Sequence, residues 1–188
     1  MQNQTIRTLL TAGSIWSFGA GLFFPIFAIF SSNVGGDITD AGIAAAIFIL
    51  VTSALEYPIG KLLDKYHEKN FIVIDYFLEA AVFIGYIFVQ NVIQLFVLQV
   101  VLGIANAIGD PAWESLYGRS AANSKSGSLW ANSHLFIGIF NAVGILLGTY
   151  LVSIYGFSAA FLLGAISSCI TGILAILYIN KTHCPLCK

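Results

Sequence analysis

The sequence predicts an all-α integral membrane protein, a bundle of six spanning helices. Of the 188 residues, 58% are hydrophobic and only 9% are charged, whereas an ordinary soluble domain carries about 25% charged residues. Apolar stretches of about 20 residues, the length that crosses a bilayer, recur along the chain. The formal net charge of −1 leaves no basic surface to neutralise phosphates, which argues against a nucleic-acid partner.

Six stretches have the required length and composition. The first is too long for a signal-peptide core and lacks a small-x-small cleavage site, so we expect it to remain as a helix. Turn and breaker residues separate the stretches, as in SSNVGGDITD after the first and YGRSAANSKSGS after the fourth. We expect the third and fourth, and the fifth and sixth, to form tight antiparallel hairpins. The predicted spans are residues 8–31, 41–63, 70–90, 92–116, 127–153 and 157–179.

The basic residues predict the orientation of the chain. Lysine and arginine gather in the cytoplasmic loops of membrane proteins. Here all of them fall at the N-terminus, in the connections after the second and fourth spans, or in the C-terminal tail: Arg7, Lys61, Lys65, Lys69, Arg119, Lys125, Lys181 and Lys188. We therefore predict a multi-pass protein of the cell membrane, a plasma or inner membrane, with both termini in the cytoplasm.

The chain shows a weak internal repeat. Pro25 and Pro111 are 86 residues apart, and Gly60 and Gly148 are 88 apart. This spacing predicts two three-helix repeats, residues 1–90 and 91–180, followed by a cytoplasmic tail, residues 181–188. Because each repeat has an odd number of spans, the second must be inverted. Inverted repeats with helices interrupted by Gly or Pro are typical of transporters; the alternative is chance, since both residues are common in spanning helices.

Charge is concentrated at the end of the second span, in GKLLDKYHEK. Gly60 has no side chain, so another helix could approach closely there. Asp64, among the cations Lys65 and Lys69 at the membrane edge, could act as a latch that holds one conformation, and Glu56 lies beside it. The alternative is a solvated loop that only fixes the topology.

This stretch resembles the signature Gly-x-x-x-Asp-Arg/Lys-x-Gly-Arg-Arg/Lys of the major facilitator superfamily. His67 and Glu68 stand where the family usually has Gly and Arg. LGIANAIGDPAW is similar to the family's fourth helix, and AVGILLGTYLVSIYGFSAAF to its passage from the fifth helix to the sixth. The resemblance implies one six-helix half of that transporter fold, and it implies a cytoplasmic gate formed by Asp64 and Lys65.

Three departures from the family pattern bear on function. Gln99 stands where the family often has an intramembrane Arg. The Gly-Pro signature of many drug/proton antiporters is absent from the fifth span, where Gly144 and Gly148 remain, spaced for close packing. The family normally has two six-helix bundles with the pathway between them. The resemblance therefore implies a partner for this single bundle, either a second copy in a homodimer or another half-transporter.

Five carboxylates lie in the spans or at their ends. A charged carboxylate at the bilayer centre costs at least about 2.5–3.5 kcal/mol. We therefore expect these groups to be protonated, hydrated or paired with another subunit, and to share a vestibule at the cytoplasmic side. They are Glu56, Asp75, Glu79, Asp110 and Glu114.

Two polar stripes predict the pathway itself. Gln99, Asn106, Asp110 and Glu114 recur at helical spacing on the fourth span, with Trp113 beside them, and His134 and Asn141 share a face of the fifth with Trp130 and two glycines. The predicted proton and substrate pathway is Asn106, Asp110, Glu114, His134 and Asn141, in which histidine titrates near neutrality. The alternative is that these groups only hydrogen-bond neighbouring helices. The resemblance implies scaffold positions for Asp75 and Glu79, which are four residues apart on the third span.

The tail THCPLCK resembles half of a zinc site at His183, Cys184 and Cys187. A tetrahedral site needs four ligands, so we interpret the tail as a frayed end and predict no metal and no cofactor.

The sequence as a whole predicts a transporter subunit that moves a small solute by alternating access, coupled to protons or ions. One alternative is a non-transporting scaffold or regulatory subunit. Another is an aspartyl protease that pairs Asp75 with Asp110, but other signatures of that class are missing, and we predict no enzymatic activity. Nothing in the sequence indicates the substrate.

Overall fold

The computed structural model describes residues 2–121 and 126–181, and their side chains over 6–120 and 127–177. In this part of the chain, six helical segments are long and apolar enough to cross a membrane, which confirms the predicted spans. α1, η1 and α2 together form the first of them. The elements are α1 Gln2–Phe23, η1 Phe24–Ile26, α2 Phe27–Asn33, α3 Ile38–Leu63, α4 Glu68–Ile87, α5 Val92–Ala121, α6 Ser126–Tyr155 and α7 Phe157–Lys181.

Local sequence signals set several helix ends. α3 begins at a capping box, in which the Asp37 carboxylate accepts from the Asp40 N–H and the Asp40 carboxylate accepts from the Asp37 N–H, both at 2.9 Å. Gly35 and Gly156 adopt φ of +88° and +80°, a conformation that favours glycine. These two glycines turn the chain before α3 and before α7.

Pro25 and Pro111, the prolines of the predicted repeat, have different effects on their helices. Pro25 lies in the 3-10 turn η1 that separates α1 from α2. Pro111 lies inside the continuous helix α5. The expectation that both prolines interrupt their helices is therefore confirmed for Pro25 and wrong for Pro111. Proline has no backbone N–H to donate, and α5 continues through Pro111 with that one hydrogen bond missing.

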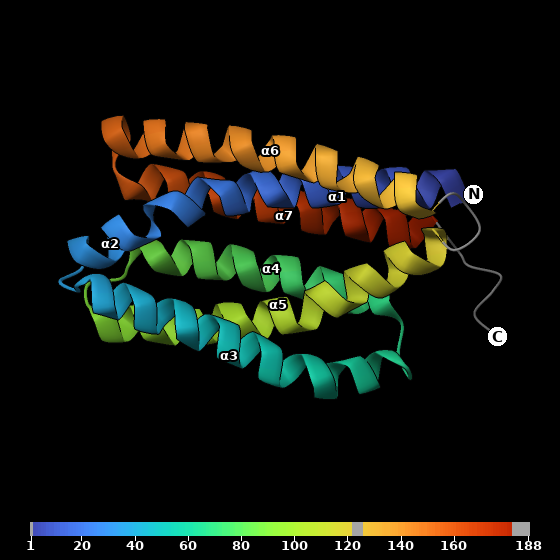
Figure 1. Ribbon diagram of the computed structural model, residues 1–188, viewed down its shortest axis with the longest axis horizontal. Helices are drawn as coiled ribbons and strands as arrows, with labels where there is room; N and C mark the ends of the chain where they lie inside the picture. Colours follow the sequence, from blue (N-terminus) through green and yellow to red (C-terminus); the bar gives the residue numbers. More distant parts are fainter. Residues whose placement is uncertain (1, 122–125, 182–188) are drawn as a thin grey trace.

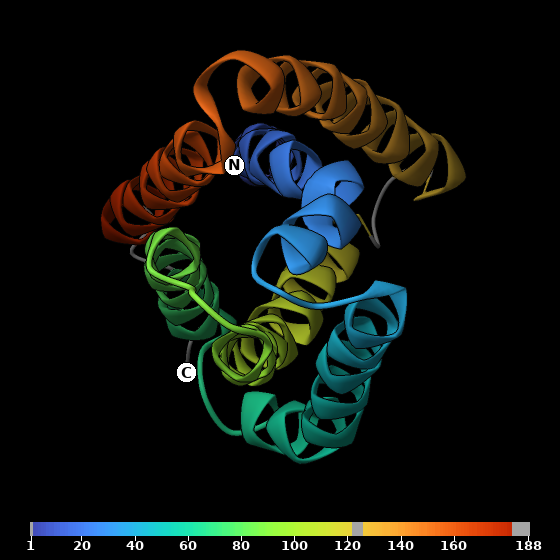
Figure 2. The ribbon, with the colours of Figure 1, turned by 90° about the vertical axis from the view of Figure 1, so that its left-hand side faces the viewer.

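The six spans form an arc when viewed end-on (Figure 2). α1, α7, α4 and α5 pack in succession around the centre, while α6 packs on α1 and α3 packs on α5. α3 and α6 therefore stand at the two ends of the arc. α4 and α5 form the tight hairpin that was predicted, whereas α6 and α7 diverge after Gly156, because α6 packs mainly on α1 and α7 mainly on α4.

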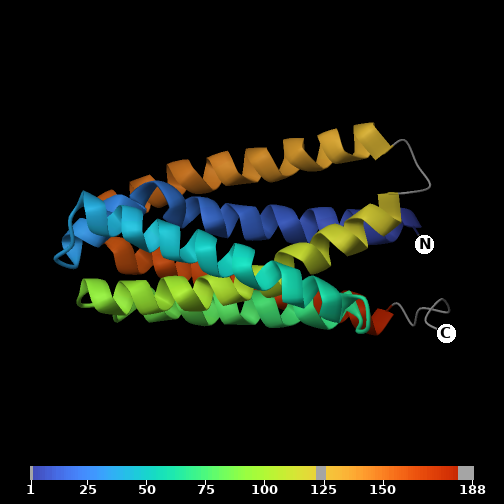
Figure 3. The same cartoon turned by 60° about the horizontal axis from the view of Figure 1, so that its bottom comes forward.

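The basic residues with described side chains lie at one end of the bundle, which we call the basic end. The chain begins there, α3, α5 and α7 finish there, and α4 and α6 start there (Figures 1 and 3). The basic end carries Arg7, Lys61, Lys65, Lys69 and Arg119. The described part of the chain therefore begins and ends at the basic end; that this end faces the cytoplasm stays a prediction.

Aromatic rings fill the centre of the bundle at the opposite end. We call this group the aromatic cluster. The centroids of its paired rings are 4.7–6.5 Å apart, and the pairs are stacked, tilted or edge-on; stacked and edge-on pairs are the arrangements that aromatic rings prefer. Its members come from α1, α2, α4 and α7 and are Phe23, Phe27, Phe30, Phe83, Tyr86, Phe157 and Phe161. The cluster closes this end of the central four helices.

Candidate functional site

A cavity lined by carboxylates and aromatic rings lies between the central helices. Its volume is about 100 Å³, room for about three water molecules at their liquid volume. α1, α4, α5 and α6 line it, and we call it the acidic cavity. Its lining residues are Gly13, Trp16, Asp75, Tyr76, Gly109, Asp110, Trp113, Glu114 and Ile137.

Asp75 is the most deeply buried carboxylate of this lining. Its side chain is 5% exposed, and its Oδ1 atom has no hydrogen-bond partner among the described residues. A Cβ added to Gly109 would overlap the Asp75 carboxyl group, so the missing side chain on α5 makes the room that Asp75 occupies. Asp75 interacts electrostatically with Glu79 and Asp110. A buried carboxyl oxygen without a donor indicates a position that a ligand or a proton can satisfy.

Glu79 lies beside the cavity and links two helices. It is 3% exposed, and both of its carboxylate oxygens accept from the indole Nε1 of Trp16, at 2.9 and 2.7 Å. This contact joins α4 to α1 across 63 residues of sequence. This contact is consistent with the interpretation of Glu79 as a scaffold residue, whereas the sequence did not indicate the place of Asp75 in the cavity lining. Gly109, directly before Asp110, is the signal that could have indicated it.

The stripe on α5 lies along the cavity for part of its length. Asp110 and Glu114 both line the cavity, and Asp110 interacts electrostatically with Glu114 and with Glu56 of α3. Glu114 is exposed. The Asn106 Oδ1 atom is buried and meets no donor in the described part of the chain. The structure thus gathers the five predicted carboxylates in or beside one cavity.

The α6 residues of the predicted pathway lie elsewhere. His134 is exposed, and its ring centroid is 6.1 Å from that of Trp130. Asn141 donates to the Ser17 carbonyl at 3.1 Å, and Ser17 Oγ donates to the Ile137 carbonyl at 3.2 Å. Neither His134 nor Asn141 lines the acidic cavity, so their part in a pathway stays a prediction. Asn141 instead has the helix-joining contact that was its alternative interpretation.

The predicted gate lies at the basic end and is largely exposed. Asp64 and Lys65 are exposed. A Cβ added to Gly60 would meet nothing within 4 Å. The close approach of another helix at Gly60 is therefore wrong within the described chain, because α3 leaves the bundle at this end and stands apart from α4 (Figure 1).

Glu68, the departure from the family signature, makes the best-defined contact near the gate. It is 7% exposed, forms an ion pair with Arg119, and accepts from Ser115 Oγ at 3.3 Å. Arg119 also donates to Ser115 Oγ at 3.1 Å. The group joins the start of α4 to the end of α5. Sequence reasoning treated Glu68 only as a substitution in a motif; opposite charges at the open end of a predicted hairpin were the available signal.

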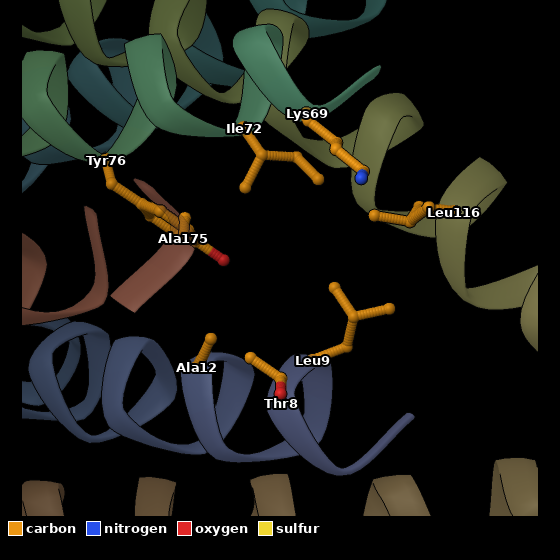
Figure 4. A pocket seen from close by; sticks show the side chains of 8 residues that line it. All are labelled: Thr8, Leu9, Ala12, Lys69, Ile72, Tyr76, Leu116 and Ala175. Carbon is orange, nitrogen blue, oxygen red and sulfur yellow. The ribbon is translucent and has the colours of Figure 1, made fainter. Parts of the chain in front are cut away.

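A second, smaller cavity lies nearer the basic end (Figure 4). Its volume is about 20 Å³, enough for about one water molecule. Lys69 and Leu116 stand on one side of it and the α1 residues on the other, as Figure 4 shows. Tyr76 lines both cavities and so separates them. The lining consists of Thr8, Leu9, Ala12, Lys69, Ile72, Tyr76, Leu116 and Ala175.

The weak metal candidate cannot be placed. His183, Cys184 and Cys187 lie outside the described residues. Within those residues, no group of three or more His, Cys, Asp or Glu side chains is arranged to hold a metal ion.

Three relatives illustrate what the chain is similar to. It is 25% identical over 158 residues to the uncharacterized MFS-type transporter YitZ of Bacillus subtilis, covering 84% of this chain and 96% of that protein. It is 27% identical over 150 residues to the uncharacterized MFS-type transporter MJ1560 of Methanocaldococcus jannaschii, covering 76% and 37%. It is 26% identical over 164 residues to the multidrug resistance protein MdtG of Erwinia billingiae, covering 85% and 40%.

These relatives are of two sizes. The match spans nearly the whole of the Bacillus protein but only about two fifths of the other two. A family model matches residues 9–184, and the chain belongs to the Major Facilitator Superfamily.

Proposed function

We propose that this chain is a transporter subunit that moves a small solute across the membrane by alternating access. The acidic cavity carries this proposal, because it offers polar groups inside a bundle otherwise built to be apolar, and intramembrane carboxylates mark substrate and ion pathways. The aromatic cluster supports it too, since it closes the end of the bundle opposite to the basic end. Family membership points to a non-enzymatic role, although Asp75 and Asp110 do line one cavity.

We further propose that the carboxylates of α5 couple transport to protons or other cations. Asp110 and Glu114 stand in one cavity with no Lys or Arg among its lining residues. A proton or a cationic solute that enters the cavity would balance their charges. His134, on the exposed face of α6, is the remaining candidate of the predicted pathway.

The coupling proposal predicts the behaviour of a double variant. Purified protein in liposomes, with a pH gradient, should accumulate at least one of a panel of labelled probes: glucose, alanine, choline and ethidium. In the variant Asp110→Asn with Glu114→Gln, the dependence of this flux on the pH gradient should be lost, because neutral amides carry no exchangeable charge.

Two comparisons complete this experiment. The variant Gln94→Asn, at the start of α5 and far from the cavity, should keep the dependence on pH. A flux that depends on pH equally in the wild type and in the double variant contradicts the coupling assignment. Fluxes at the level of protein-free liposomes for every probe, with and without the gradient, contradict transport by this chain and favour the scaffold alternative.

We propose that the working unit is a homodimer, with another half-transporter as the alternative partner. α3 and α6, at the two ends of the arc, are the least buried spans, with 17% and 11% of their apolar windows buried. Relatives of which the match covers about 40% have more sequence outside the matched part than inside it, whereas the Bacillus relative is about the size of this chain. A second copy related by a two-fold axis along the membrane normal would set α3 against α6 of its partner.

Disulfide crosslinking tests the homodimer. Leu50 on α3 and Val143 on α6 are 69% and 51% exposed and lie at matching depths in their helices. With Cys169, Cys184 and Cys187 replaced by Ser, the variant Leu50→Cys with Val143→Cys should yield a covalent dimer in membranes. Ile74→Cys, equally exposed on α4 at the far side of the arc, should not. Crosslinking at Ile74 alone contradicts the proposed interface.

We also propose that the two halves of the chain, residues 1–90 and 91–180, are inverted repeats. The packing supports this: exchanging the two triplets of spans converts the α1–α6 pair into α5–α3, converts α1–α7 into α5–α4, and leaves the α4–α7 pair unchanged. Each of these pairs packs extensively. The close-packing glycines follow the same exchange, with Gly103 of α5 against α3 and Gly21 of α1 against α6.

A further inference from the structure

We propose that the acidic cavity binds a compact organic ammonium ion, held by Asp75 and Asp110 against the rings of Trp16 and Trp113. The proposal names a substrate class for the transporter and rests on the proposed function. Its elements are a void of about 100 Å³, three carboxylates, two indoles and a phenol in one lining.

The lining of the acidic cavity is rich in carboxyl groups. Asp75, Asp110 and Glu114 line it, with Glu79 of α4 and Glu56 of α3 in electrostatic contact with members of this set. Among the described residues that line the cavity there is no Lys, Arg or His. Glu79 has its donor in Trp16, but Asp75 Oδ1 has none in the described part of the chain, although the residue is only 5% exposed. The missing group is a cation or a hydrogen-bond donor.

Two indole rings, those of Trp16 and Trp113, form part of the same lining. Trp113 stacks on Tyr117 with centroids 5.0 Å apart and planes 5° from parallel, and Tyr117 is itself fixed by a hydrogen bond of 2.9 Å from its hydroxyl to the Leu129 carbonyl. Trp16 is fixed by Glu79. Rigid indole rings beside carboxylates are the surroundings in which proteins recognise quaternary ammonium groups.

The size of the cavity and its ligands favour an organic ion over a metal ion. Gly13 leaves part of the space, since a Cβ there would come to 3.4 Å from Trp113 Cζ2 and 3.6 Å from Ile137 Cδ1, while Gly109 leaves the room that the Asp75 carboxyl group occupies. A metal ion prefers several converging oxygen ligands, and no such group is arranged among the described residues. A methylated ammonium fills the space and uses both carboxylate and ring.

The test is a binding experiment on the purified protein in detergent. Choline is the probe, and 3,3-dimethylbutan-1-ol, its uncharged isostere, is the matched control. Two of the three tryptophans line the cavity, so choline chloride should change the intrinsic fluorescence saturably, relative to sodium chloride at equal ionic strength. The isostere should bind at least about tenfold more weakly. Equal effects of choline and the isostere, or of choline and sodium, overturn the proposal.

Variants locate the site. Asp75→Asn should weaken choline binding about tenfold or more, since it removes a buried charge. Gly13→Ala narrows the cavity without changing charge, and it should weaken binding while the protein folds normally, because alanine favours a helix. Gly138→Ala, the same change where a Cβ would meet open space on α6, should bind choline like the wild type. Unchanged choline affinity in both Asp75→Asn and Gly13→Ala overturns the proposal.

This experiment separates the two proposals. Saturable choline binding with no flux in liposomes leaves the ammonium site standing and contradicts the transporter function. A pH-dependent flux of another probe, with no choline binding, leaves the function standing and overturns the ammonium site. If protons alone change the fluorescence and choline has no effect, the cavity is a protonation site and the ammonium proposal fails.

Discussion

Valine in place of Gly144 is expected to prevent α6 from docking on α1 and to abolish most of the folded protein. A Cβ at position 144 would overlap the carbonyl oxygen of Phe18, and one at Gly148 would come within 3 Å of the Leu22 backbone. Backbone atoms of a helix cannot move aside individually, so α6 has to retreat along its length. Overpacking costs about 1–3 kcal/mol and sometimes more, and here it also breaks the hydrogen bond from Asn141 to the Ser17 carbonyl.

The measurement is the yield of monodisperse protein in detergent and its thermal unfolding midpoint. Gly138→Val is the matched control, because it lies on the same helix and a Cβ there would meet nothing within 4 Å. It should behave like the wild type apart from the weaker helix preference of valine, a few tenths of a kcal/mol. Equal losses at positions 138 and 144 would show that close packing of α6 on α1 is not the cause.

Phenylalanine in place of Trp16 is expected to produce the second large loss of stability. It removes the indole N–H that both oxygens of Glu79 accept and leaves a carboxyl group that is 3% exposed without this donor. An unsatisfied buried polar group costs about 1–3 kcal/mol, and more when it is charged. The unfolding midpoint should fall clearly when it is measured by size exclusion after heating, a readout that does not depend on tryptophan fluorescence.

A double variant isolates the cause of that loss. Trp16→Phe with Glu79→Met removes both polar partners and replaces them with apolar groups of similar shape, which is often nearly neutral for stability. Its midpoint should recover toward that of the wild type, above that of Trp16→Phe alone. A double variant at least as unstable as the single one would mean that the indole matters for packing and that its bond to Glu79 contributes little.

The membrane-spanning elements were predictable because their signals are local. Length and hydropathy identify each span without knowledge of its neighbours, and the bounds differ by only a few residues, as at Glu68, where α4 begins before the predicted residue 70. The position of the basic residues at one end of the bundle could also be predicted from the sequence, since alternate connections of a multi-pass chain lie on the same side. The capping box at Asp37 and Asp40 is likewise a local feature.

The site was predictable only in part. Asp110 and Glu114 recur at helical spacing, so their shared face on α5 followed from the sequence. The α4 side of the cavity could not be predicted from the sequence, because it depends on how α4 is rotated about its own axis. That rotation brings Asp75 against Gly109 and Glu79 against Trp16. The surroundings of the α6 stripe could not be predicted for the same reason. The packing of α6 on α1 places Asn141 against the Ser17 carbonyl and leaves His134 exposed, and their part in a pathway stays a prediction.

The amino-acid sequence by itself determined that this chain lies in a membrane, where its spans begin and end, and which connections carry the positive charge. Each of these depends on free energies of transfer and on caps that act within one segment. The tertiary structure alone decided which carboxylates share a cavity and which residues only join helices. Those outcomes depend on contacts such as Gly144 with Phe18 and Glu79 with Trp16, which fix the rotation of each helix between residues far apart in the chain.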